Sequence, residues 1–238
     1  MLKVENLSYI VEQNGQPKTI LKDINFECDC KNLVITGHNG SGKSTLLKIL
    51  MGILPATSGK MFFDGQDITN LSISERANLG IAFAFQTPIC FKGLTVKKLL
   101  QIASQKTEKD IAVYCDILSK LGMCARDYID REVSSKLSGG EQKRIEIATV
   151  VARDAKLNLF DEPEAGIDIW SFDGLLDVFA NIKGQNIIVS HQKKLMETAD
   201  KILVLSGGEV KMFGDTKEIL PKLENNQSCA RLSKEGEN

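Results

Sequence analysis

Apolar and polar residues alternate along the first part of the chain in the way expected of strands followed by one helix. Leu2–Ser8 and Ile20–Cys28 have the period of two that is typical of strands with one buried face. Leu33–Thr36 is a continuous apolar run, which indicates a short strand buried on both faces. After a glycine-rich stretch, Thr45–Ile53 has apolar side chains at helical spacing. These segments predict a buried strand that leads through a glycine-rich loop into a helix.

The middle of the chain has a different pattern, in which helical periodicity occurs without a strong strand signal. Val96–Ser104 and Lys109–Leu121 both space their apolar residues along one face of a helix. We therefore expect a helical insertion from about Pro88 to Lys136.

The last third alternates between strand-like and helix-like segments. Short apolar runs are expected to form buried strands, and amphipathic segments are expected to form helices. The strands are Leu157–Phe160, Asn186–Ser190 and Lys201–Leu205, and the helices are Glu141–Arg153, Ser171–Ile182 and Lys193–Thr198. Two further strands, Lys60–Phe63 and Ile81–Phe85, precede the insertion. Such alternation predicts an α/β fold with a mainly parallel sheet covered by helices on both faces.

Length and composition are those of an average globular protein. The chain has 238 residues, of which 42% are hydrophobic and 26% are charged, and this excludes a disordered or collagen-like chain. From Glu224 onward the chain is polar, so we expect a disordered tail over residues 224–238. The remainder, residues 1–223, is expected to be a single domain.

Charge and hydropathy argue against binding to nucleic acid and against insertion into a membrane. Thirty basic and thirty-one acidic residues leave a net charge of −1, without the basic excess that phosphate backbones require. No apolar run approaches the roughly 20 residues that cross a bilayer. The start of the chain has no export signal. We therefore expect a cytoplasmic protein, which would reach the inner face of a membrane only through a partner.

The cysteines give no metal-binding or disulfide signature. They stand at positions 28, 30, 90, 115, 124 and 229, without a Cys-x-x-Cys pair or nearby histidines. Cys28 and Cys30 are two residues apart, so their side chains would point the same way from a strand. We expect reduced structural thiols, because cysteine is often buried and cytosolic thiols stay reduced.

The glycine-rich stretch carries the clearest chemistry. Gly37-His38-Asn39-Gly40-Ser41-Gly42-Lys43-Ser44-Thr45 matches the pattern GxxxxGK[ST] between a strand and a helix. Glycines let successive backbone N–H groups face one anion, and the helix start adds its dipole. Lys43 is expected to face the β and γ phosphates of a nucleotide, and the Ser44 hydroxyl is expected to bind Mg²⁺. The pattern leaves His38 free, so we expect it to be a solvated loop residue.

Two acids follow the strand Leu157–Phe160. At the carboxyl end of this strand, Asp161 can reach the Mg²⁺ shell beside the phosphate loop, which we define as residues 37–45. Glu162 is then free to polarise an attacking water. An Asp-Glu pair alone is weak, but together with the phosphate loop it indicates a nucleotide-hydrolysing site.

The most specific stretch is Leu137-Ser138-Gly139-Gly140-Glu141-Gln142-Lys143-Arg144, which we call the signature segment. It resembles the signature of the ATP-binding-cassette (ABC) ATPases, and the resemblance covers Met1 to about Leu223. The resemblance implies a P-loop NTPase fold with an N-terminal antiparallel β subdomain and a helical insertion. As a start of a helix, Ser138 is expected to be an N-cap that is followed by two glycines, Gly139 and Gly140, in a second anion site.

Further residues take roles that the resemblance implies. Gln86, after the strand Ile81–Phe85, matches the glutamine that links the core to the helical insertion and touches the metal. His191, after Asn186–Ser190, matches the histidine that senses the γ-phosphate. Ala165-Gly166-Ile167-Asp168 matches the loop that communicates between two copies. The resemblance implies a head-to-tail homodimer, in which each ATP lies between the phosphate loop of one chain and the signature segment of the other.

Three features resemble the cytosolic ATPase of the Suf iron–sulfur assembly system. Where many transporter cassettes have an aromatic residue that stacks on adenine, this chain has Val11, with Tyr9 two residues earlier. Ile169 follows Asp168, where many transporter cassettes have proline. The third feature is Glu75-Arg76-Ala77 with Gly80-Ile81, leading into Ala84-Phe85-Gln86-Thr87-Pro88.

Other features favour a transporter cassette. Arg76-Ala77 and Gly80-Ile81, together with Phe91 and Leu94-Thr95-Val96, also resemble importers of amino acids. Glu162-Pro163-Glu164-Ala165-Gly166 is typical of transporters too. We prefer the Suf-type interpretation, with a Suf-type scaffold as the partner. A membrane permease partner is the alternative, and a nucleotide-binding regulator without hydrolysis is disfavoured by Glu162 and His191.

Overall fold

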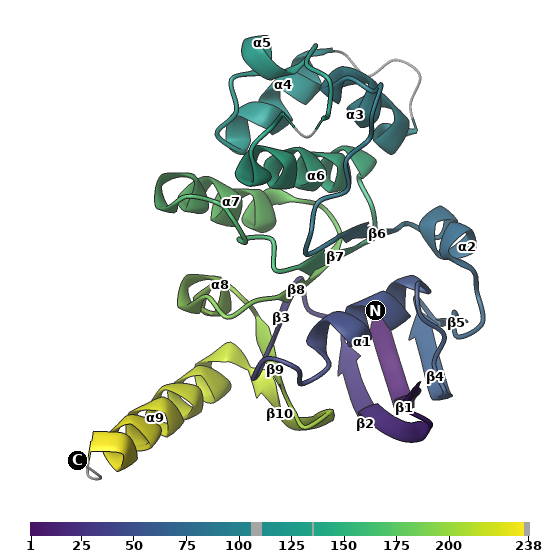
Figure 1. Cartoon of the computed structure of the whole chain (residues 1–238), viewed down its shortest axis with the longest axis vertical. Helices are drawn as coiled ribbons and strands as arrows, with labels where there is room; N and C mark the ends of the chain where they lie inside the picture. The colour runs from purple at the N-terminus through teal and green to yellow at the C-terminus, as the bar shows by residue number, and fades with distance from the viewer. Residues whose placement is uncertain (106–110, 135, 236–238) are drawn as a thin grey trace.

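Two sheets form the base of the computed structural model, which describes residues 1–105, 111–134 and 136–235 (Figure 1). The smaller sheet is antiparallel, and its strand order is β2-β1-β4-β5. Its strands are β1 (Leu2–Gln13), β2 (Gln16–Cys28), β4 (Ser58–Phe63) and β5 (Gln66–Asp67). Burial alternates along the second half of β2, as its period-two pattern predicts.

The larger sheet has the strand order β10-β9-β3-β8-β7-β6. Its strands are β3 (Asn32–Thr36), β6 (Ile81–Ala84), β7 (Leu157–Asp161), β8 (Gln185–Val189), β9 (Lys201–Ser206) and β10 (Glu209–Asp215). Every neighbouring pair is parallel except β9–β10, which is a hairpin around Gly207 and Gly208. The mainly parallel sheet and the N-terminal antiparallel sheet are therefore confirmed.

Each face of the larger sheet has its own hydrophobic core. In β3, Val34 packs into the core on the side of the helical insertion, whereas Leu33 and Ile35 pack into the core between the two sheets. Helix α1 (Lys43–Met51) is buried in the second core through Leu46, Leu47, Ile49 and Leu50. Buried on both faces, β3 holds the phosphate loop that follows it in a fixed position.

The helical insertion lies above the larger sheet in Figure 1. Helices α3 (Val96–Ser104), α4 (Ile111–Lys120) and α5 (Ala125–Tyr128) belong to it, and α3 and α4 pack against α6 (Gly139–Arg153). The first two residues of the helix predicted over Lys109–Leu121 lie outside the described residues. The predicted insertion is confirmed, and its helices share one core with the sheet.

The remaining helices are α2 (Ile73–Asn78), α7 (Ile169–Asn181), α8 (Lys193–Glu197) and α9 (Thr216–Glu235). Helix α9 differs from the prediction of a disordered tail, because the backbone from Glu224 to Glu235 is helical. After Pro221 the sequence has no proline or glycine before Gly236, and Glu, Gln and Lys are good helix formers. A polar composition therefore does not by itself prevent a helix here.

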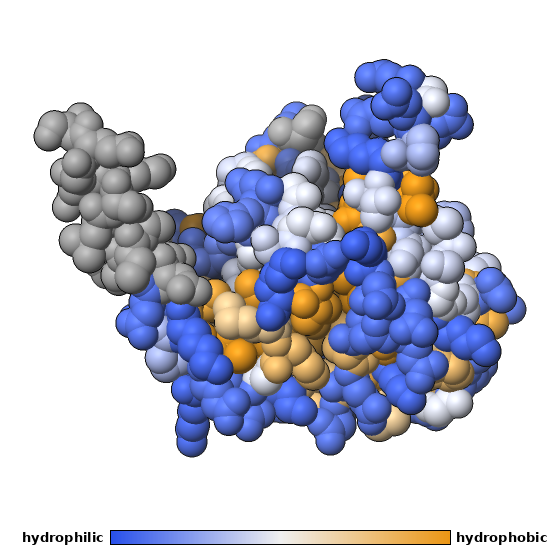
Figure 2. Space-filling view, turned by 90° about the horizontal axis from the view of Figure 1, so that it is seen from below, coloured by the Kyte–Doolittle hydropathy of each residue, from blue (hydrophilic) through white to orange (hydrophobic). Residues whose placement is uncertain are grey.

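Viewed from below, the molecule has apolar side chains gathered over the middle of this face and hydrophilic side chains around them (Figure 2). Among the described helices, none combines the length and the apolar character that a membrane span requires.

Candidate active site

The phosphate loop joins β3 to α1 in a backbone conformation that requires glycine. Gly37, Gly40 and Gly42 have φ angles of 139°, 79° and 98°. A Cβ atom on Gly37 would lie 1.9 Å from the carbonyl oxygen of Leu205 in β9, so any side chain there would displace the backbone. Gly42 is the N-cap of α1, so the N-terminus of this helix points into the space that the phosphate loop encloses.

Lys43 is held across the loop by backbone carbonyls. Its Nζ donates to the carbonyl oxygens of Gly37 at 2.7 Å and His38 at 2.9 Å. The side chain is buried, and burial lowers the pKa of its ammonium, opposed by the negative charges of Glu162 and Asp161. None of the ion pairs among the described residues involves Lys43. The arrangement leaves a positive charge in place for an anionic ligand.

Ser44 and Asp161 provide oxygen atoms side by side at the mouth of the loop. The Ser44 hydroxyl donates to Oδ1 of Asp161 at 2.8 Å. Oδ2 of Asp161 is buried and has no hydrogen-bond partner among the described residues. Burial raises the pKa of Asp161, and the Ser44 hydrogen bond opposes this. An orphaned carboxylate oxygen beside a hydroxyl fits a hard cation such as Mg²⁺, which prefers oxygen ligands.

Most of the predicted residues meet in one pocket of about 640 Å³. The predicted residues that line it are Asn39, Gly40, Gly42, Lys43, Ser44, Thr45, Gln86, Glu162 and His191. Gly37, Ser41 and Asp161 do not line the pocket: Gly37 is packed behind the loop against Leu205, and Ser41 and Asp161 are buried. The predicted residues therefore lie together on the floor and one wall of this pocket, and their roles in binding and catalysis stay predictions.

Glu162 is positioned by both its backbone and its side chain. Its N–H donates to the carbonyl of Val189 at 3.0 Å, its carbonyl accepts from Ala165 at 3.1 Å, and its φ is 46°. Nε2 of Gln86 donates to Oε2 of Glu162 at 2.9 Å. Gln86 thus holds the carboxylate in this structure, and its expected contact with the metal stays a prediction.

His191 lies on the same pocket wall directly after β8. Burial lowers the pKa of its imidazole, and the positive charge of Lys43 acts in the same direction. Next to it, the Ser190 hydroxyl donates to Oε1 of Glu164 at 2.5 Å and accepts from the N–H of Gln192 at 2.9 Å. These bonds fix the turn that presents the imidazole to the pocket.

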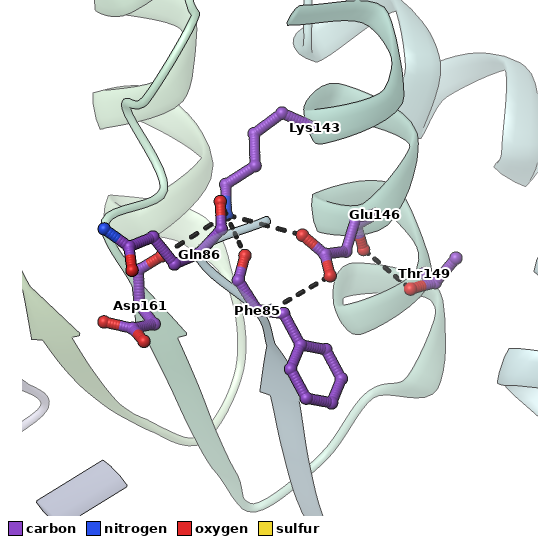
Figure 3. A network of polar contacts seen from close by, with 6 residues as sticks. All are labelled: Phe85, Gln86, Lys143, Glu146, Thr149 and Asp161. Atoms are coloured by element: carbon purple, nitrogen blue, oxygen red, sulfur yellow. Dashed lines mark hydrogen bonds and ion pairs between the residues drawn. The ribbon is translucent and has the colours of Figure 1, made fainter. Parts of the chain in front are cut away.

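A buried network behind the pocket was not predicted from the sequence (Figure 3). Lys143 reaches down from α6 and is fully buried. Its Nζ donates to the carbonyl oxygen of Phe85, to that of Asp161 at 3.3 Å, and to Oε2 of Glu146 at 3.4 Å. Oε1 of Glu146 accepts from the N–H of Phe85 at 2.9 Å. The helix of the signature segment is thereby bonded to the ends of β6 and β7, where Gln86 and Asp161 stand.

The signature residues Ser138, Gly139 and Gly140, all within the described part of the chain, do not line this pocket. Ser138 caps its own helix, since its hydroxyl accepts from the N–H of Glu141 at 3.2 Å. A Cβ atom on Gly140 would lie 2.5 Å from the carbonyl oxygen of Gly166. Within one chain the signature segment therefore packs against residues 165–168 instead of reaching the phosphate loop.

The far wall of the pocket is aliphatic where an adenine ring could lie. It is formed by Lys18 and Ile20 of β2. Neither Tyr9 nor Val11, both within the described residues, lines it. Tyr9 packs instead against the core between the sheets. The pocket wall therefore comes from β2 and not from β1, where Tyr9 and Val11 lie. Val11 is paired with Lys18 on the neighbouring strand, and the sequence alone does not show which of two paired strands faces the pocket.

Comparison with known proteins shows to which family this architecture belongs. The family model described as ABC transporter matches residues 21–165, which is more than half of the 238 residues. The chain belongs to the ABC transporter family. An uncharacterised ABC transporter ATP-binding protein of Methanocaldococcus jannaschii is 37% identical over 230 residues, covering 92% of this chain and 90% of that protein.

Two further ABC relatives differ in what their names state. The iron–sulfur cluster assembly protein SufC of Plasmodium falciparum is 32% identical over 244 residues, covering 94% of this chain and 69% of that protein. A dimeric bacterial ABC transporter cassette superposes with a TM-score of 0.81 at 22% identity, covering 91% of this chain and 99% of the other. Family membership confirms the expected fold and the class of ATP-hydrolysing enzyme.

Proposed function

We propose that two copies of this chain hydrolyse ATP at a shared interface and use the resulting movement to drive a partner protein. The observation that carries the proposal is the pocket that brings together Lys43, Ser44, Glu162 and His191 while Ser138 of the same chain stays outside it. A site of this kind lacks one wall in the single chain. The dimer of the structurally similar cassette supports a second copy as that wall.

In this mechanism each residue has a task that its position allows. The N–H groups of residues 37–45 and the Lys43 ammonium bind the β and γ phosphates. Glu162 accepts a proton from the attacking water, and the His191 imidazole bonds to the γ-phosphate. Ser44 and Asp161 would hold Mg²⁺, with Gln86 as a further ligand. When bound, Mg²⁺ would draw negative charge from the phosphate oxygens.

Glu162→Gln tests the chemical step. The amide keeps the shape and the bond to Gln86 but cannot accept the proton. We expect ATP affinity within about threefold of the wild type and a loss of turnover of about 10²-fold or more. The variant should accumulate as an ATP-bound dimer in size-exclusion chromatography.

Asp173→Asn, an exposed carboxylate that pairs with Lys194 on the surface, is the matched control and should keep full turnover. Wild-type turnover by Glu162→Gln would refute the role given to this residue. A stable monomer in the presence of ATP would refute the shared interface.

For the partner we propose a soluble Suf-type scaffold, with a membrane permease as the alternative. The pocket wall of Lys18 and Ile20, which lacks an aromatic ring among the described lining residues, supports the Suf-type interpretation, and so does the similarity to the SufC protein. The similarity to the transporter ATP-binding protein keeps the alternative open. Arg76 does not discriminate between the two kinds of partner, because it is buried and bonds to backbone carbonyls inside the chain.

The docking surface is proposed to be the start of the helical insertion. Ile89 and Phe91 are 46% and 42% exposed, whereas Leu94 packs against the core of the insertion. Both exposed side chains follow Gln86, which bonds to Glu162, so a displacement of this segment can be coupled to the state of the active site.

Phe91→Asp should leave basal turnover within about twofold, since a surface change away from the site costs little. It should abolish co-purification with the partner. Ile73→Asp, on α2 with a similar exposure of 45%, is the control and should keep the partner. A partner recovered only from a detergent extract, as an integral membrane protein, would favour the transporter alternative. An unchanged yield of partner with Phe91→Asp would exclude this surface.

A further inference from the structure

Two cysteine side chains meet at the edge of the larger sheet opposite the phosphate loop. Cys28 is the last residue of β2, and Cys30 lies in the connection to β3. Their Sγ atoms are 2.9 Å apart. Cys28 is fully buried and Cys30 is half-buried, so only one of the two sulfurs is open to a reagent. Residues two apart on an extended chain have Cα atoms about 6.6 Å apart, within the range that a disulfide spans.

The side chain of Gln185, at the start of β8, fixes both cysteines in this position. Its Nε2 donates to the carbonyl oxygens of Cys28 and Cys30, both at 2.9 Å, and lies 3.1 Å from Sγ of Cys28. The backbone on both sides of the pair is thereby held by one amide. The sulfurs are pre-positioned by the fold, because no rotation of the chain is needed to bring them into contact.

The thiols differ in acidity as well as in access. The hydrogen bond from Cys30 lowers the pKa of the Cys28 thiol, and the positive charge of Lys201 acts in the same direction. The same hydrogen bond, together with burial, raises the pKa of Cys30. The hydrogen bond between the two sulfurs therefore favours a thiolate at Cys28 over a thiolate at Cys30.

A metal site fits these residues less well than a redox pair does. The described residues contain no cluster of three or more His, Cys, Asp or Glu side chains that could hold a metal ion. Two sulfurs in contact, without a third ligand, match a dithiol that can close into a disulfide.

We propose that Cys28 and Cys30 are a reversible redox pair, which a small-molecule disulfide such as oxidised glutathione converts into an internal disulfide. Cys30 Sγ, once deprotonated, attacks one sulfur of the oxidant. The S–S bond of the oxidant breaks, and the departing thiolate takes up a proton to become a thiol. The Cys28 thiolate then attacks Sγ of Cys30, and the mixed disulfide breaks to release the second thiol. Two protein thiols are oxidised, and one disulfide is reduced to two thiols.

The pair lies outside the active site, so the proposal does not depend on ATP hydrolysis. Cys30 must lose its proton before it attacks the oxidant, so the first attack should accelerate with increasing pH. Cys28 resolves the mixed disulfide quickly, because the sulfurs are already in contact.

Mass spectrometry tests the proposal directly. The reduced, full-length protein is incubated with oxidised glutathione, quenched with N-ethylmaleimide and digested with trypsin, which releases Asp23–Lys31 with both cysteines. We expect this peptide to lose two hydrogen atoms and to carry neither glutathione nor maleimide, and dithiothreitol should reverse the change. The peptides that contain the exposed residues Cys90 and Cys124 should instead carry glutathione, because each has one cysteine.

Two variants make the result specific. Cys28→Ser should leave glutathione attached to Cys30, because no thiol is present to displace it. Cys30→Ser should leave Cys28 unmodified, because its sulfur is buried. The proposal is overturned if wild-type Asp23–Lys31 stays reduced while Cys90 and Cys124 react, or if it retains glutathione on Cys30 as the Cys28→Ser variant does.

Discussion

Glu162 has a left-handed backbone conformation that residues with a side chain rarely adopt, at a cost of about 1–2 kcal/mol. The conformation persists because Val189 and Ala165 bond to its backbone on both sides. It points the carboxylate back across the pocket toward Gln86. The strain is thus located at the residue that we assign to the chemical step, where a fixed orientation is most useful.

At this scale the sequence predicts residue types better than contacts. Lys43 and Ser44 could be assigned because their spacing repeats a loop geometry that few other residues can form, and Asp161 because it ends a strand that was expected beside this loop. The bond from Gln86 to Glu162 could not, since it joins the ends of two strands that are far apart in the chain. Lys143 was missed because a lysine on a helix is ordinarily exposed.

The pKa of His191 gives a prediction at the same scale. In the protein without nucleotide, the pKa should lie below the ordinary value of 6.5, because burial and Lys43 both oppose the protonated form. Lys43→Ala should raise it by removing a nearby positive charge, and Glu162→Gln should lower it further by removing a negative one. A titration followed by NMR of the imidazole protons would measure both shifts.

The assignment in that titration is simple, because the chain has two histidines. His38→Gln leaves one set of signals, which belongs to His191. An identical midpoint in the wild type and in Lys43→Ala would contradict the electrostatic coupling between the two residues.

Helix α6 is the element that connects the signature segment with the active site. Through Lys143 and Glu146 it is bonded to the ends of β6 and β7. A rotation of α6 therefore displaces Phe85 and Asp161, or breaks the hydrogen bonds that Lys143 and Glu146 make to them. Apart from α9, the long helices and most of the strands were predicted well, because their periodicity is local. The elements α2 and β10 were missed: α2 has six residues, and β10 is a half-buried edge strand in which charged residues interrupt the apolar ones.

The buried pair of Lys143 and Glu146 predicts a stability pattern. Lys143→Met should destabilise the protein by about 3 kcal/mol, because it leaves Glu146 as an uncompensated buried charge. Lys143→Met combined with Glu146→Gln should recover most of this loss, since the amide can still accept from Phe85. Unfolding in urea would measure both variants.

Lys120→Met is the control, since Lys120 pairs with Asp116 on the surface, and it should change stability by less than about 0.5 kcal/mol. If the double variant were as unstable as Lys143→Met alone, the cost would come from the lost bonds to the backbone carbonyls and not from the unpaired carboxylate.

On the scale of the whole molecule, the phosphate loop and the signature segment lie in separate parts of one chain. Helix α6 packs together with the helical insertion on one side of the larger sheet, while α1 is buried on the other side. Family resemblance supplied the expectation of a second copy. Neither periodicity nor composition could do so, because an interface between chains has no local pattern. The polar composition of the last residues led to the prediction of a disordered tail, although the same composition also fits the helix α9.

Mixed dimers test whether the site is shared between chains. We expect a dimer with Lys43→Ala in one chain and Ser138→Arg in the other to keep one intact site and to retain turnover. Both lesions then fall on the same shared site. Differently tagged chains, co-expressed and purified in sequence, would give this species for an ATP turnover assay.

The matched control places both substitutions in one chain and pairs it with a wild-type chain. Each shared site then has one lesion, so this dimer should be inactive. The opposite result, with turnover in the control and none in the mixed dimer, would mean that each chain forms a complete site alone.

Arg76 has a consequence for the conditions that the site can tolerate. Its guanidinium donates to the carbonyls of Ile49 and Leu50 at the C-terminal end of α1, at 2.6 and 2.8 Å, and to those of Leu71 and Thr69. Among the described residues no carboxylate pairs with it. Acid cannot protonate these acceptors, and salt screens a buried contact weakly. Arg76 therefore anchors the C-terminal end of the helix that begins at the phosphate loop. This anchor should persist at high salt concentration and in mild acid, conditions in which surface ion pairs fail.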